Sequence, residues 1–174
     1  NIEIVKGEHL VIKGINGVGK STLIKTLLGI IKPFSGDVER STTITLGYFE
    51  QEVEGNRNTP RDEIWDQFPT LTQGEVHAAL AACGLTSEHI ESQIITLSGG
   101  EAARVRLCKL TIGEYNCLVL DEPTNHLDVD AKEELKRALK EYKGSILMVC
   151  HEPEFYEGLA TRVIDCTQFT TKIF

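Results

Sequence analysis

Two apolar runs without polar alternation form the framework of this sequence. Residues 117–120 (CLVL) and 146–150 (ILMVC) contain no charged position. Runs of this kind are typical of parallel strands that helices cover on both faces. Between the runs, apolar side chains recur at helical spacing, at Ala131, Leu135, Ala138, Leu139 and Tyr142. The pattern predicts a β-α-β unit around a buried parallel sheet.

Polar side chains follow both predicted strands. Asp121 and Glu122 come directly after the first run, and His151 follows the second. Open α/β sheets bind their ligands at the carboxyl ends of parallel strands. We therefore expect these three side chains at a substrate site.

The start of the chain has the same strand-then-helix pattern. Val11 and Ile12 lead into a glycine-bearing loop at residues 14–21, GINGVGKS, and apolar residues at helical spacing follow it up to Gly29. Residues 44–49 are predicted to be a further strand. The loop matches the GxxxxGK[ST] pattern of nucleotide-binding phosphate loops. The expected fold class is therefore α/β, a P-loop NTPase with a mostly parallel sheet flanked by helices.

Residues 52–96 differ in character from the rest. Asparagine, proline and glycine separate short helical pieces there, one of which begins at a capping box from Thr72 to Glu75. We interpret the segment as a small inserted helical subdomain. Residues 1–51 and 97–174 would then form the ATP-binding core.

Composition narrows the possible functions. The 174 residues suit one domain, and the net charge of −8 opposes nonspecific binding to nucleic acid. No apolar run approaches the length that crosses a bilayer, so we expect no direct membrane insertion and a cytoplasmic location. The five cysteines show no CxxC spacing, and a metal or disulfide role is not expected.

The loop at residues 14–21 matches the pattern GxxxxGK[ST]. Glycines let backbone N–H groups turn inward around phosphate oxygens, and the following helix adds its positive end. Lys20 would reach the β- and γ-phosphates and Ser21 would bind magnesium. The residues expected to hold the nucleotide here are Asn16, Gly17, Val18, Gly19, Lys20, Ser21 and Thr22.

The acidic pair after the first apolar run suits the same chemistry. Asp121 would hold magnesium, because an unpaired carboxylate at the end of an apolar strand would be costly. Glu122 would be the base that orients or deprotonates the attacking water. The plain alternative is a pair of solvated acids.

The order of the motifs identifies a family. The phosphate loop is followed by LSGGE at residues 97–101 and by DEPTNHLD at residues 121–128. The chain resembles the nucleotide-binding cassette of the ABC ATPases, and the DEPTNHLD form is similar to the ABC-F subgroup. The resemblance implies hydrolysis of ATP with Mg²⁺, in sites shared by two cassettes.

Further residues are assigned through this resemblance. Gln51 matches the glutamine that contacts magnesium and the attacking water, and His151 matches the histidine that contacts the γ-phosphate. Asp128 matches the aspartate that links the two shared sites, although it also suits a helix N-cap. Ser98, Gly99 and Gly100 would bind ATP held by the other cassette. Ser98 and Glu101 also fit a simple capping box.

The resemblance also sets expectations for the whole protein. The chain lacks an initiator methionine, so we expect a piece of a longer polypeptide, and the short segment 52–96 favours the second cassette of an ABC-F protein. ABC-F proteins act mostly on the ribosome, in translation or antibiotic resistance, through rRNA contacts outside this segment. Cassettes of this family usually stack adenine on an aromatic residue that precedes the phosphate loop. No aromatic residue precedes Gly14 here, so we expect weak ATP affinity. Because the sites are shared by two cassettes, the isolated cassette is expected to be a weak or inactive ATPase.

Three other classes remain open as alternatives. The first is the nucleotide-binding subunit of a membrane transporter. The second, a chromosome-organising ATPase, is disfavoured because no coiled-coil heptads separate the motifs. The third is a nucleotide-binding module with negligible turnover until it is paired.

Overall fold

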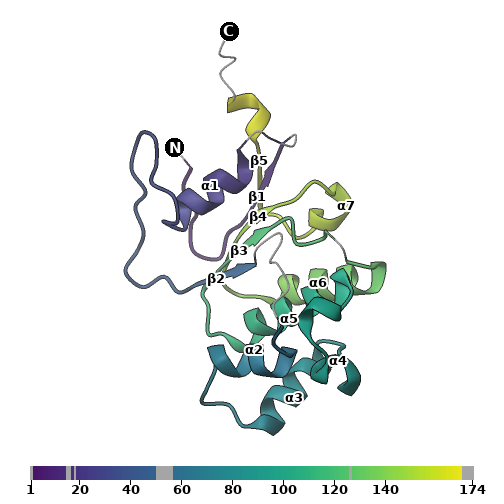
Figure 1. Cartoon of the computed structure of the whole chain (residues 1–174). Coiled ribbons are helices and arrows are strands. Elements are labelled where there is room, and N and C mark those ends of the chain that lie inside the picture. The colour runs from purple at the N-terminus through teal and green to yellow at the C-terminus, as the bar shows by residue number, and fades with distance from the viewer. Residues whose placement is uncertain (1, 15–16, 18, 50–56, 126, 170–174) are drawn as a thin grey trace. The chain divides into compact units, whose positions relative to one another are not determined.

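The computed structural model describes residues 2–14, 17, 19–49, 57–125 and 127–169. The chain divides into two compact units. The sheet unit comprises residues 1–51, 115–124 and 138–174, and the helical unit comprises residues 52–114 and 125–137. Figure 1 labels the helices and strands of both units.

The sheet unit is built on parallel strands. The described residues form one five-stranded sheet in the order β2-β3-β4-β1-β5, and each neighbouring pair is parallel. The strands are β1 (His9–Lys13), β2 (Leu46–Phe49), β3 (Cys117–Asp121), β4 (Ser145–Val149) and β5 (Arg162–Asp165). The three central strands β3, β4 and β1 are adjacent, so their carboxyl ends lie side by side.

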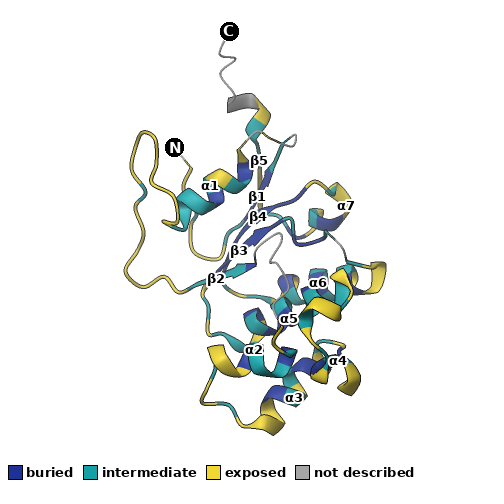
Figure 2. Cartoon of the chain, viewed as in Figure 1, coloured by how far each residue is buried: buried dark blue, intermediate teal, exposed yellow. Residues whose placement is uncertain are grey.

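Both faces of the central strands are buried, as the unbroken apolar runs predict. All five residues of β3 and all five of β4 are buried (Figure 2). Ile24 of α1 (Lys20–Leu27) packs in a cluster with Leu10 and Leu147 on one face. Phe155 of α7 (Pro153–Tyr156) is also buried. A short 3-10 helix, η2 (Cys166–Phe169), follows β5.

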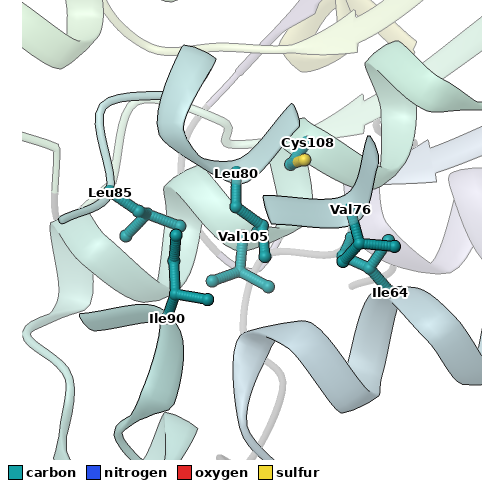
Figure 3. Close-up of a cluster of buried hydrophobic side chains, with 7 residues drawn as sticks. All are labelled: Ile64, Val76, Leu80, Leu85, Ile90, Val105 and Cys108. Carbon is teal, nitrogen blue, oxygen red and sulfur yellow. The ribbon is translucent and has the colours of Figure 1, made fainter. Parts of the chain in front are cut away.

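The helical unit consists of short capped helices. These are α2 (Pro60–Gln67), α3 (Gln73–Ala82), α4 (Ser87–Glu91), the 3-10 helix η1 (Ile94–Thr96) and the longer α5 (Gly99–Ile112). Thr72 and Glu75 form the predicted capping box of α3. The helices share one apolar core (Figure 3), made of Ile64, Val76, Leu80, Leu85, Ile90, Val105 and Cys108.

The helical unit is larger than the inserted segment expected from the sequence. It includes α5 and the first part of α6 (Val129–Glu141), whereas the sequence suggested a return to the ATP-binding core at residue 97. The reason is that Val105 and Cys108 of α5 complete the core of the short helices. The functional division, with an ATP-binding core at 1–51 and 97–174, stays a prediction.

Candidate functional site

The glycine-bearing loop leads from β1 into α1. Gly17 and Gly19 have left-handed φ values of 81° and 93°, which residues with a Cβ adopt only with strain. Lys20, 5% exposed, donates from Nζ to the carbonyl oxygen of Gly14 at 2.9 Å. The side chain therefore folds back over the loop, and Ser21 and Thr22 follow in the first turn of the helix. Asn16 and Val18 lie outside the described residues.

Asp121 ends β3 in an unusual environment. Its side chain is 1% exposed, and Oδ1 accepts no hydrogen bond from the residues that the structure describes. Burial raises the pKa of Asp121, and a hydrogen bond with Ser21 opposes that shift. A buried acceptor without a partner is costly unless a cation or a donor completes it. With the Ser21 hydroxyl beside it, Asp121 offers the oxygen ligands that Mg²⁺ prefers.

Glu122 has a strained backbone held by neighbouring groups. Its φ is 48°, which makes it the one described residue other than glycine with a positive φ. Its N–H donates to the carbonyl oxygen of Val149 at 3.0 Å. Backbone strain of this kind persists where surrounding contacts fix it, often at active sites.

His151 lies against the carboxylate of Glu122. The distance from His151 Nε2 to Glu122 Oε1 is 2.9 Å, and the two side chains are 36% and 14% exposed. The register explains this proximity, because Asp121 of β3 pairs with Val149 of β4. A carboxylate that an imidazole holds in place at the carboxyl ends of parallel strands can accept a proton from water.

The sheet unit thus brings together most of its predicted site residues. Lys20, Ser21 and Asp121 are close to one another, and Glu122 and His151 are in contact. Gln51 lies outside the described residues.

In the helical unit, LSGGE forms the start of α5. Ser98 is the N-cap, and Gly99 and Gly100 are the first residues of the helix. The Ser98 hydroxyl accepts from the N–H of Glu101 at 3.3 Å, and Glu101 Oε2 accepts from the N–H of Ser98 at 2.8 Å. The capping box is therefore present. A capped helix start with exposed Ser98 and Gly99 can offer donors to an anion.

Asp128 has a capping role in the same unit. Its Oδ1 accepts from the N–H of Ala131 at 2.8 Å, and its backbone oxygen accepts from Lys132 at 3.0 Å. Its Oδ2 lies 3.6 Å from Arg104 of α5, a contact that the sequence did not predict. The basic character of Arg104 was the available signal, but a contact between residues so far apart along the chain could not be read from spacing.

The described residues hold no group of three or more His, Cys, Asp or Glu side chains that could bind a metal ion. Within the same residues, no helix has both the length and the apolar character needed to span a membrane. Cys108, Cys117 and Cys150 are buried and free. Burial raises the pKa of Cys117 and Cys150, so both thiols stay protonated.

Comparisons with known proteins agree on one family. The family model described as "ABC transporter" matches residues 1–125. The chain is 60% identical to "Uncharacterized ABC transporter ATP-binding protein YfmM" of Bacillus subtilis (strain 168), over 99% of this chain and 34% of that protein. It is 37% identical to "ABC transporter F family member 2" of Arabidopsis thaliana, over 95% of this chain and 25% of that protein. The chain thus spans about a third or less of these relatives.

Solved structures confirm the fold. The dimeric structure of MJ0796, a bacterial ABC transporter cassette, has a TM-score of 0.81 at 21% identity, over 95% of this chain and 83% of that chain. The complex of archaeal ribosomal stalk protein aP1 with ribosome recycling factor aABCE1 has a TM-score of 0.75 at 26% identity, over 94% of this chain and 32% of that chain. The predicted P-loop NTPase fold is confirmed.

Proposed function

Because the chain belongs to the ABC transporter ATP-binding family, we propose that it binds ATP with Mg²⁺ and hydrolyses it when paired with a second cassette. ABC cassettes are ATPases, so the reaction class follows from the family. The observation that carries the proposal is the position of Glu122, strained in φ and in contact with His151, beside the buried Asp121.

The phosphate loop would hold the triphosphate. Lys20 would leave the carbonyl of Gly14 for the β- and γ-phosphates, exchanging one acceptor for a more strongly charged one. The backbone N–H groups of Gly17, Gly19 and the first turn of α1, which includes Ser21 and Thr22, would add further donors. Asn16 and Val18 would complete the loop.

Ser21, Asp121 and Gln51 would hold the magnesium ion. Two observations support this assignment: Oδ1 of Asp121 is buried without a hydrogen-bond partner, and the Asp121 side chain has a hydrogen bond with Ser21. A bound cation would remove the energetic cost of the buried acceptor. When bound, Mg²⁺ neutralises charge that develops on the β- and γ-phosphate oxygens.

Glu122 would act on the attacking water. Its Oε1 is held by His151, and the carboxylate fixed in this way would accept a proton from the water or align the water for in-line attack. His151 would keep Glu122 in place and contact the γ-phosphate. Gln51 would help to position the water.

Residues 97–101 (LSGGE), the signature segment, would act on ATP held by the other cassette. Ser98, Gly99 and Gly100 form a capped helix start, with Ser98 and Gly99 exposed and Gly100 half-buried, and this helix start suits the γ-phosphate. Asp128, 64% exposed, would link the two shared sites. The dimeric MJ0796 structure shows a cassette of this fold as a pair, which supports the arrangement. An isolated cassette would then hydrolyse ATP weakly or not at all.

The biological setting that we propose is an ABC-F protein acting on the ribosome, with this chain as its second cassette. Support comes from the "ABC transporter F family member 2" relative and from the similarity to aABCE1, which is named as a ribosome recycling factor. Residues 57–96 form only short helices, the longest of ten residues, and so do not form the long basic arm that the first cassette of an ABC-F protein often carries.

The test uses the full-length protein with Glu122→Gln. This variant should bind ATP without hydrolysing it, so that its two cassettes stay paired around the nucleotide. Ribosomes are sedimented with and without ATP, and the double variant Lys20→Ala/Glu122→Gln serves as the control. We expect ATP-dependent enrichment on ribosomes for Glu122→Gln alone. Recovery in the membrane fraction, without ribosomal enrichment, would contradict the ribosomal role and favour a transporter subunit.

A further inference from the structure

His89, outside all the motifs above, contacts the signature segment. It lies in α4, and its Nε2 is 3.3 Å from Glu101 Oε1, with the two side chains 30% and 25% exposed. Glu101 is the residue whose other oxygen accepts the N–H of Ser98. His89 is therefore one contact away from the end of α5 that would face ATP.

The opposite ring nitrogen of His89 is also engaged. Nδ1 accepts from the N–H of Thr86 at 3.4 Å, while the N–H of His89 donates to the Thr86 hydroxyl at 3.3 Å. Since Nδ1 is an acceptor, the neutral ring carries its proton on Nε2, the atom that faces Glu101. The capping box of α4 thus selects the tautomer that can donate toward the carboxylate.

The two helices that carry this contact share the core of the helical unit. Ile90, next to His89 in α4, is buried in the same apolar core as Val105 of α5. The pairing of α4 with α5 therefore does not depend on the polar contact alone. Arg104 also acts on Glu101: its charge, like that of a protonated His89, lowers the pKa of the Glu101 carboxyl, after the larger effect of the hydrogen bonds with Ser98.

We propose that His89 is a positioning residue for the signature segment. It would fix the rotamer of Glu101. Glu101 in turn would hold the Ser98 N–H, so that the Ser98 hydroxyl keeps the geometry that presents it to the partner's ATP. The last step rests on the proposed function of Ser98. The first step concerns only the helical unit.

Three variants separate this role from simple capping of α4. His89→Glu keeps an acceptor for the Thr86 N–H but places a carboxylate against Glu101. His89→Gln keeps both an acceptor and a donor. The double variant His89→Glu/Glu101→Gln replaces the repelled carboxylate at position 101 by an amide, which can donate to the carboxylate introduced at position 89 while still accepting from Ser98.

Amide hydrogen exchange in the full-length protein tests the first step. For His89→Glu we expect exchange about two- to fivefold faster in the peptide covering residues 96–103, a size typical of partly exposed charge pairs. The peptide covering α3 is the internal control and should not change. His89→Gln should match wild type. The double variant should exchange more slowly than His89→Glu without fully reaching the wild-type rate, because Glu101→Gln also removes the charged acceptor of the Ser98 N–H.

ATP hydrolysis by the same proteins tests the second step. His89→Glu should raise the ATP concentration for half-maximal rate by about two- to fivefold, with partial recovery in the double variant. Wild-type behaviour of His89→Glu in either assay would overturn the inference. If Ser98→Arg leaves wild-type hydrolysis intact, the proposed function of Ser98 fails instead, and the exchange result still reports on the first step.

Discussion

His151 Nε2 lies 2.9 Å from Glu122 Oε1, although the two residues are 29 positions apart. The parallel pairing of β3 with β4 brings them together, since Asp121 pairs with Val149 and both residues follow at the same sheet edge. The contact joins two groups that the proposed hydrolysis needs, a carboxylate base and the imidazole that orients it.

Glu122→Gln should abolish most hydrolysis and spare ATP binding. The amide keeps the shape of the side chain but cannot accept a proton, so the rate should fall by about 10² to 10⁴. Phosphate release measures the rate, and titration with a fluorescent ATP analogue measures binding. The control, Glu157→Gln, changes an exposed glutamate of the same unit and should retain activity. Equal loss of ATP binding in Glu122→Gln would contradict the role.

His151→Ala should lower hydrolysis by about 10², because Glu122 loses its orienting partner and the γ-phosphate loses a donor. His151→Gln, whose amide can reach Glu122, should retain part of the lost activity. His77→Ala removes a histidine of the helical unit and serves as the control. A His151→Ala protein with the wild-type rate would show that the contact is not used.

Ile64→Ala should destabilise the helical unit by about 2 to 5 kcal/mol, because it opens a cavity in a fully buried position. The matched variant Ile95→Ala changes an isoleucine that is 59% exposed and should shift the free energy of unfolding by about 0.5 kcal/mol or less. Trp65, the one tryptophan of the chain, lies in α2 and reports urea unfolding by fluorescence. Equal effects of the two variants would contradict the assigned core.

Glu101→Gln should destabilise the helical unit in a pH-dependent way. Hydrogen bonding to Ser98, with smaller effects of His89 and Arg104, lowers the pKa of Glu101 from its ordinary value of 4.5. A lowered pKa means that the ionised form is favoured by folding. Its contribution is fully present above 4.5 and is lost as pH falls through the folded value.

The expected loss in Glu101→Gln is therefore about 0.5 kcal/mol at neutral pH, and it should vanish in strongly acidic solution. Urea unfolding followed by Trp65 fluorescence at both pH values measures it. A difference between variant and wild type that grows on acidification would reverse the expected sign.

Much of the fold could be predicted because strong local signals coincide with the observed elements. The apolar runs at 117–120 and 146–150 are β3 and β4 to within one residue at each end, since unbroken burial leaves no competing helical period. The capping boxes at Thr72 and Ser98 were also legible, because they depend on residues three positions apart.

Features that depend on tertiary packing were not predictable. β5 is short and half exposed, so it gives no distinct apolar run, and it forms because β1 offers an edge. The contacts of His89 with Glu101 and of Arg104 with Asp128 join segments that only the packing of the helices brings close. The extent of the helical unit likewise depends on α5 completing its core.

In the proposed pair, Ser98 of one cassette completes the site around Lys20 of the other. Mixing two inactive variants of this chain, Lys20→Ala and Ser98→Arg, tests it most directly through phosphate release at high protein concentration. Half of randomly formed pairs would contain one chain of each variant. In such a pair, Ser98 of the Lys20→Ala chain meets Lys20 of the Ser98→Arg chain in one intact site, and the other site contains both changes. The equimolar mixture should therefore recover about a quarter of the wild-type rate. A mixture as inactive as its two components would contradict the account.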